Sequence, residues 1–89
     1  MIFSLRRTRD GAGDSGPMSV ALWREGDNIK SEDLARPRVG VCMKVGSPYA
    51  RSYNSQDWWM TTFITEIIED QENYVRFKTG NSEYEWKVF

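Results

Sequence analysis

The sequence predicts an all-β fold, a small four- or five-stranded antiparallel barrel with a flexible N-terminal tail. Residues 58–68, 74–79 and 82–89 form three runs rich in aromatic, β-branched and threonine residues. Such residues favour strands because their side chains pack well on a pleated surface. Gly80 and Asn81 separate the last two runs, and both tolerate the positive φ that a tight hairpin turn demands. These observations predict consecutive antiparallel strands.

Residues 1–17 are predicted to be a flexible tail and linker, and residues 18–89 the folded domain. Residues 10–17 contain three Gly, two Asp and one Pro. This composition offers little apolar surface to offset the entropy that is lost on ordering. Residues 1–9, with their apolar side chains beside three arginines, are expected to belong to the tail. A short strand or helix docked on the domain is the alternative for them.

The middle of the chain predicts a short strand, a turn and one helical turn. Residues 19–23 form an apolar run that suits a strand or an apolar plug, and residues 24–28 suit a turn. Ser31 could cap a helix, which Pro37 would limit to about one turn because it holds its preceding residue in an extended state.

The later strands are predicted from the alternation of their side chains. Residues 39–45 place Val39, Val41, Met43 and Val45 on one face. Both faces of residues 58–68 are partly apolar, which predicts a bent or bulged strand that serves two layers of a closed or nearly closed sheet. Residues 74–79 and 83–88 should each form a strand with one solvent-exposed face and one buried face.

Composition bounds the size and the chemistry of the protein. A chain of 89 residues forms one small domain, and four Trp, four Tyr and four Phe enlarge its modest core. Twelve Lys and Arg against 13 Asp and Glu give a net charge of −1, which provides no overall steering towards nucleic acid.

Catalytic and metal-binding motifs are missing from the sequence. There is no His, the commonest general base and metal ligand, and Cys42 is the single cysteine. We therefore expect a protein that is not an enzyme and has no cofactor, no metal and no disulfide. The lack of disulfides, of an apolar run of about 20 residues and of a signal peptide predicts a cytoplasmic protein without a membrane span.

From Val45 onward the order of features resembles a Tudor-type domain, a small barrel of the Src-homology-3-like kind. Val45-Gly46-Ser47, Ala50 to Tyr53, the Trp58-Trp59 pair and Phe77 to Asn81 are the counterparts of the family motifs, within residues 44–89. The resemblance implies an aromatic cage of the kind that binds methylated lysine or arginine. Thr79 replaces a tyrosine of the family pattern, and Lys78 puts a cation where an acidic or polar wall is expected. The small chain also resembles proteins encoded by phages and other mobile elements.

The candidate site combines aromatic and basic side chains. Rings near the polar loop at residues 54–57 could stack on a peptide or a base, and cations beside aromatics could grip single-stranded nucleic acid. Core packing is the alternative for the rings, and cross-strand pairing with Glu83 and Glu85 is the alternative for the cations. The candidate partner-binding residues are Tyr49, Arg51, Tyr53, Trp58, Trp59, Arg76 and Lys78.

The sequence favours a non-catalytic binding module that engages a protein or peptide partner through its aromatic loop surface, as an adaptor or a phage-type inhibitor. A nucleic-acid-binding barrel that uses the basic and aromatic face is the alternative. A homo-oligomer formed through an exposed edge strand at residues 86–89 is a further expectation.

Overall fold

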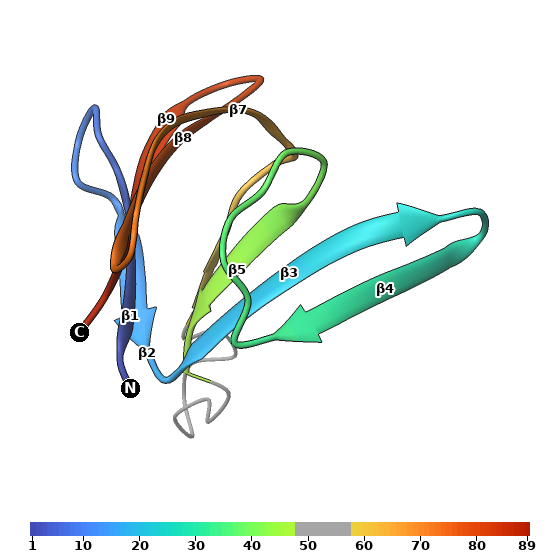
Figure 1. Ribbon diagram of the computed structural model, residues 1–89, viewed down its shortest axis with the longest axis horizontal. Coiled ribbons are helices and arrows are strands. Elements are labelled where there is room, and N and C mark those ends of the chain that lie inside the picture. The colour runs from blue at the N-terminus through green and yellow to red at the C-terminus, as the bar shows by residue number, and fades with distance from the viewer. Residues whose placement is uncertain (48–57) are drawn as a thin grey trace.

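The computed structural model describes residues 1–47 and 58–89 and shows an all-β chain with two antiparallel sheets (Figure 1). The five-stranded sheet has the order β2-β1-β9-β8-β7, and the four-stranded sheet has the order β4-β3-β5-β6. The strands are β1 (Phe3–Arg7), β2 (Gly13–Gly16), β3 (Met18–Glu25), β4 (Asn28–Asp33), β5 (Cys42–Gly46), β6 (Trp58–Met60), β7 (Ile64–Gln71), β8 (Tyr74–Thr79) and β9 (Glu83–Val88).

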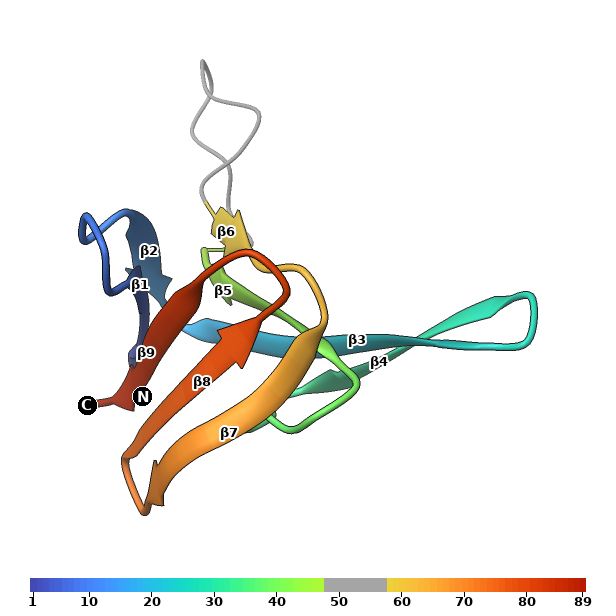
Figure 2. The ribbon, with the colours of Figure 1, turned by 90° about the horizontal axis from the view of Figure 1, so that it is seen from above.

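The prediction of an all-β fold is confirmed, whereas the count of four or five strands is wrong. The described residues form nine strands in two hydrogen-bonded sheets, and no closed barrel joins them within that part of the chain. Figure 2 shows β7, β8 and β9 lying across β3 and β5, so that the two sheets form two layers. The core fills the space between them.

The N-terminal segment is part of the folded sheet, which corrects the predicted flexible tail at residues 1–17. β1 pairs with β9, with Phe3 opposite Val88 and Leu5 opposite Trp86, and both N-terminal side chains are buried. β2 pairs with β1 to complete a hairpin. The segment 1–9 therefore follows the docked-strand alternative.

Packing against a neighbouring strand requires one of the glycines in residues 10–17, which composition alone does not indicate. A Cβ at Gly16 would collide with the backbone carbonyl of Gly46, so the backbones of β2 and β5 approach too closely for any side chain there.

At the turn between β1 and β2, Arg7 bonds Asp10 at 2.7 Å. That hydrogen bond, with one from the backbone of Ala12, lowers the pKa of the Asp10 carboxyl to about 2.

The helical turn predicted at Ser31 is wrong, because this segment is the edge strand β4. Gly26 and Asp27 form a two-residue turn, with Gly26 at φ 61°, and Glu25 faces Asn28 across it. The turn is therefore shorter than the predicted range of residues 24–28, because only Gly26 and Asp27 form it. Pairing with β3 satisfies the backbone of β4 and outweighs the weak capping signal.

The apolar alternation of β5 is confirmed from Val41 onward. Met43 and Val45 on β5 are buried, and so is Val41 just before the strand, whereas Val39 is exposed. The run at residues 58–68 serves both layers, as predicted, but it does so as two strands and not as one bent strand. β6 belongs to the four-stranded sheet and β7 to the five-stranded sheet.

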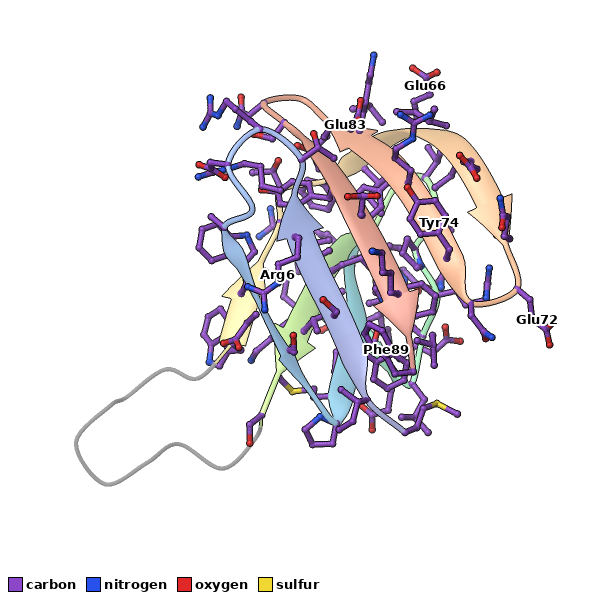
Figure 3. All side chains as sticks on the ribbon, turned by 90° about the vertical axis from the view of Figure 1, so that its left-hand side faces the viewer. Arg6, Glu66, Glu72, Tyr74, Glu83 and Phe89 are labelled. Carbon is purple, nitrogen blue, oxygen red and sulfur yellow. The ribbon has the colours of Figure 1, made fainter. Side chains whose placement is uncertain are left out.

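The β8–β9 hairpin matches its prediction in turn position and in both faces. Val75, Phe77, Tyr84 and Trp86 are buried between the layers. Figure 3 shows Tyr74 and Glu83 on the opposite, outer face of the five-stranded sheet. β9 lies between β1 and β8, however, so residues 86–89 do not form the free edge that the predicted oligomer requires.

A short chain of buried hydrogen bonds connects the two layers. The indole Nε1 of Trp86 on β9 donates to the hydroxyl oxygen of Ser19 on β3 at 3.0 Å. That hydroxyl donates to the backbone carbonyl of Ala35 at 2.9 Å, and the Ala35 N–H donates back to the Ser19 carbonyl at 2.9 Å. The ring of Phe3 packs 5.8 Å from that of Trp86. The Trp86 indole N–H, the Ser19 hydroxyl and the backbone groups of Ala35 are thereby all paired.

We expect Leu5→Ala to destabilise the protein strongly, because Leu5 is fully buried. Large-to-small changes at such sites cost about 2–5 kcal/mol. The control Ile2→Ala, at an exposed side chain near the start of the same strand, should change the free energy of unfolding by less than about 0.5 kcal/mol. Urea denaturation measures both. Equally small effects would mean that β1 behaves as a tail.

We expect Ser19→Ala to reduce the free energy of unfolding by about 1–3 kcal/mol, because it leaves the Trp86 N–H without its buried acceptor. Ser31→Ala on the exposed strand β4 is the matched control, with an expected change below about 0.5 kcal/mol. The comparison uses thermal or urea unfolding. A loss at Ser19 no larger than that at Ser31 would contradict a stabilising role for the buried hydrogen bonds.

Candidate partner-binding surface

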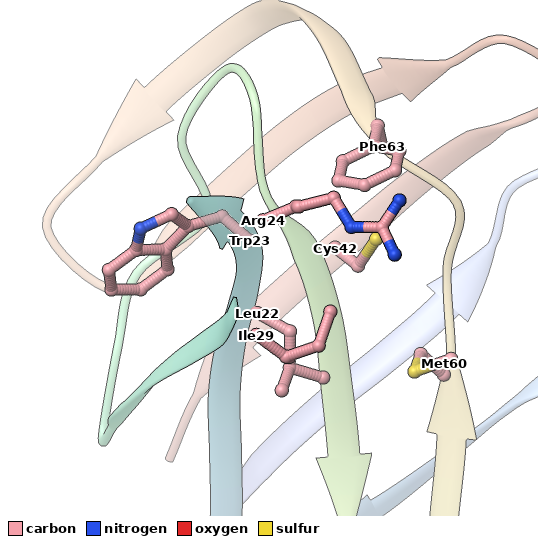
Figure 4. Close-up of a pocket in the computed structure, with 7 residues that line it drawn as sticks. All are labelled: Leu22, Trp23, Arg24, Ile29, Cys42, Met60 and Phe63. Carbon is pink, nitrogen blue, oxygen red and sulfur yellow. The ribbon is translucent and has the colours of Figure 1, made fainter. Parts of the chain in front are cut away.

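The outer face of the four-stranded sheet carries an apolar hollow of about 340 Å³, which we call the outer groove. Strands β3, β4, β5 and β6 and the segment after β6 all contribute to it (Figure 4). Its lining residues are Leu22, Trp23, Arg24, Ile29, Cys42, Met60 and Phe63.

The register of the strands explains why apolar side chains gather on this face. Ala21 and Met43 are paired across β3 and β5 and point into the core, so the next pair, Leu22 and Cys42, points outward. Met60 is paired with Lys44 on the same outer face. Strands with two apolar faces are usually covered on both sides. Within the described part of the chain, no element packs over the outer groove.

Several large side chains of the outer groove are strongly exposed. The exposed fraction is 65% for Ile29, 53% for Phe63 and 49% for Met60. Contiguous exposed apolar side chains of this kind mark interaction sites more often than isolated ones do. The groove is therefore the best candidate for a contact surface among the described residues.

One cation lies among the side chains that line the groove. Figure 4 shows the guanidinium of Arg24 reaching toward Phe63 and Cys42, whereas the Trp23 ring points away from them. The lining contains no carboxylate. Burial raises the pKa of the Cys42 thiol, which favours a neutral apolar group over a thiolate nucleophile. The groove can thus offer apolar contact and one positive charge.

The structure separates the two tryptophans that the sequence places at the site. Trp58 is paired with Gly46 on the outer face of β6, where the Lys44 ammonium nitrogen lies 4.3 Å from its ring centre. Trp59 is paired with the buried Val45 and packs on the core. Their predicted opposite orientation is confirmed. Tyr49, Arg51 and Tyr53 lie outside the described residues.

The predicted basic residues Arg76 and Lys78 lie on β8 in the other sheet, so the structure does not bring them together with Trp58. Arg76 is 3.9 Å from a Glu69 carboxylate oxygen and 3.5 Å from one of Glu83. Lys78 faces Glu83 across the β8–β9 ladder. This arrangement is the cross-strand pairing that the sequence offered as the alternative.

Tyr74 lies on the same outer face of the five-stranded sheet as Arg76, and its hydroxyl donates a 2.7 Å hydrogen bond to Glu85. This bond, together with burial and the charges of Glu85 and Glu69, raises the pKa of the phenol from 10.0 to about 12. The resulting stabilisation is present below about pH 10 and is lost as the pH rises through about 12.

Sequence reasoning missed all seven groove residues: Leu22, Trp23, Arg24, Ile29, Cys42, Met60 and Phe63. The run at residues 19–23 carried a signal, because apolar side chains occupy both of its faces. Ile29 offers no such signal in the sequence, because it lies between the predicted turn and the expected helical turn. Phe63 lies beyond β6, where the chain leaves the outer face for the other sheet.

Other kinds of site find no support in the described residues. In residues 1–47 and 58–89, no cluster of acidic, Cys or His side chains could hold a metal ion. The same residues include no helix that is long and apolar enough to cross a membrane. Comparisons with protein-family models, curated proteins and solved structures found no match to this chain.

We expect Glu85→Ala to lower the pKa of Tyr74 from about 12 towards 10, because the phenol loses its acceptor and the neighbouring negative charge. Ultraviolet absorbance of tyrosinate follows the titration. Tyr74→Phe identifies which transition among the four tyrosines belongs to this residue. An unchanged titration in Glu85→Ala would contradict the assignment of the hydrogen bond.

Proposed function

We propose that this chain is a non-catalytic binding module that engages a protein or peptide partner through the outer groove. The observation that carries the proposal is the exposure of Ile29, Met60 and Phe63 around one hollow. Burying such side chains on association is favourable by roughly 25 cal/mol per Å² of apolar area, before the costs of binding are subtracted. Large apolar and aromatic side chains also supply much of the binding energy in known interfaces.

The chemistry of the lining favours a partner with one or two apolar side chains and a nearby carboxylate. The apolar groups would occupy the space between Leu22, Ile29 and Met60. A carboxylate beside Phe63 would meet the Arg24 guanidinium, which has no acidic residue among its neighbours in the lining. Charge-assisted bonds of this type add orientation as well as affinity.

One residue of the aromatic surface predicted from the sequence, Trp58, lies on the same face as the outer groove and would enlarge the contact surface. Trp58 and Met60 alternate with the core-facing Trp59 along β6 and therefore share the outer face. The likeness of residues 44–89 to Tudor-type, Src-homology-3-like barrels also supports a binding role. Lys44 already places its own cation over the Trp58 ring, which argues against methylated lysine as the ligand of that ring. An adaptor or an inhibitor of phage type would act by covering its partner's surface.

The nucleic-acid alternative has weaker support. Its cations Arg76 and Lys78 lie beside Glu69 and Glu83, and these carboxylates would repel phosphates. The net charge of −1 adds no attraction. Protein or peptide binding is therefore the function that the geometry supports best.

The test selects binders for the chain from a library of random peptides and measures their dissociation constants by fluorescence anisotropy. We expect Phe63→Asp to weaken the selected peptides by tenfold or more, since it places a charge in the apolar groove. Phe89→Asp makes the same chemical change at an exposed phenylalanine after β9, outside the groove lining, and should change binding by less than about twofold.

Two results would contradict the proposal. One is that the library yields no peptide that binds. The other is that the peptides bind Phe63→Asp as tightly as the parent chain while circular dichroism shows that both are folded. A mobility shift with single-stranded DNA at low salt would instead favour the alternative function.

A further inference from the structure

Strand β4 presents a long free edge on a hairpin that projects from the body of the protein. Figure 1 shows β3 and β4 extending together beyond both layers, and Figure 2 shows the same hairpin from above. Every side chain from Asn28 to Asp33 is exposed. β4 pairs with β3 along one side, and within the described residues no strand pairs with its other side. A free edge of this kind is a template for pairing with another strand.

The other three sheet edges of the described residues are protected, whereas β4 is not. β2 spans Gly13–Gly16 and β6 spans Trp58–Met60, so both are short, and they also lie close to each other. The β7–β8 pairing contains two register shifts, and such bulges disrupt an edge. The β3–β4 pairing runs without a shift from Asp33 to Asn28, and β4 contains no proline. β4 is therefore the edge best suited to accept a partner strand.

We propose that β4 is a self-association edge, at which a second copy of this chain adds its own β4 in antiparallel orientation. The two copies are related by a two-fold axis that passes beside Ser31 and is normal to the sheet. The two four-stranded sheets then become one continuous sheet. This inference goes beyond the proposed function and does not rest on the outer groove.

Symmetry leaves few registers for such a pair. A rotation about an axis normal to a sheet does not exchange its faces, so each side chain lies opposite one from the same face. Two registers then align most of β4. One is centred on Lys30 and the other on Ser31.

The charges of β4 select between these two registers. Centring on Lys30 places that lysine directly opposite its own copy, and like charges in this position destabilise a sheet. Centring on Ser31 places Lys30 opposite Glu32 of the second copy, and the two-fold axis repeats this attractive pair. The accompanying pair of Ile29 with Asp33 contains no like charges. The strand is thus self-complementary in the Ser31 register.

The backbone pattern favours the same register. Asn28 faces Glu25 across the two-residue turn, so residues 28, 30 and 32 direct their backbone groups towards β3. The free N–H and C=O groups then belong to Ile29, Ser31 and Asp33. In the Ser31 register these three residues oppose one another across the axis and form about six hydrogen bonds, against about four in the Lys30 register.

The test uses two variants with reversed charge, Lys30→Glu and Glu32→Lys, each of which repels its own copy. Sedimentation velocity over a range of concentrations gives the dimer dissociation constants. We expect the parent chain to dimerise and each variant alone to dimerise about ten- to thirtyfold more weakly. An equimolar mixture of the variants should recover the parent affinity, because the two glutamates of one chain then face the two lysines of the other.

The mixture also controls for folding, since a misfolded variant could not regain affinity on mixing. Glu32→Lys loses an exposed 3.0 Å ion pair with Arg38, whereas Lys30→Glu keeps it. Circular dichroism of both variants checks whether the loss of this ion pair affects folding. The inference is overturned by a parent that stays monomeric, by single variants that dimerise as well as the parent, or by a mixture that gains no affinity. Phe63→Asp should dimerise like the parent. Loss of the dimer in that variant would place the contact in the groove and overturn the inference as well.

Discussion

The buried hydrogen bond from the Trp86 indole to the Ser19 hydroxyl fixes how the two layers meet. It connects the centre of the five-stranded sheet with β3 and, through Ala35, with the segment that follows β4. Because side chains alternate along a strand, holding Ser19 inward also holds Ala21 inward and turns Leu22 outward. A slip of one residue would exchange these faces. The outer groove therefore depends on a polar contact on the opposite side of its own sheet.

Local patterns were sufficient to predict the β8–β9 hairpin. The alternation of Val75 and Phe77 with polar neighbours is complete within one strand, and Gly80-Asn81 specifies a turn without help from distant residues. The segment at residues 10–17 could not be predicted in this way. Its glycine at position 16 is explained by the backbone of Gly46, which lies thirty residues away in the sequence. Composition cannot distinguish a glycine that gives freedom from one that makes room.

The candidate site was harder to predict than the fold for a related reason. Its side chains come from four strands and a connecting segment, and none of these contributes more than three residues. Leu22 looks like core in the sequence because apolar residues usually are core. Trp58 could be assigned to the surface, since the adjacent Trp59 had to face the other way. Arg76 and Lys78 have the composition of a basic site but face carboxylates across the ladder, a pairing that depends on register.

Pairing through the projecting β3–β4 hairpin would decide how the outer grooves of two chains are oriented. Rotation about an axis normal to the sheet leaves both outer grooves opening in the same direction, on one broad surface. A ligand that carries two matching segments on a linker could then occupy both at once. Its second contact would form at the high effective concentration set by the linker, and avidity would exceed the strength of either contact alone.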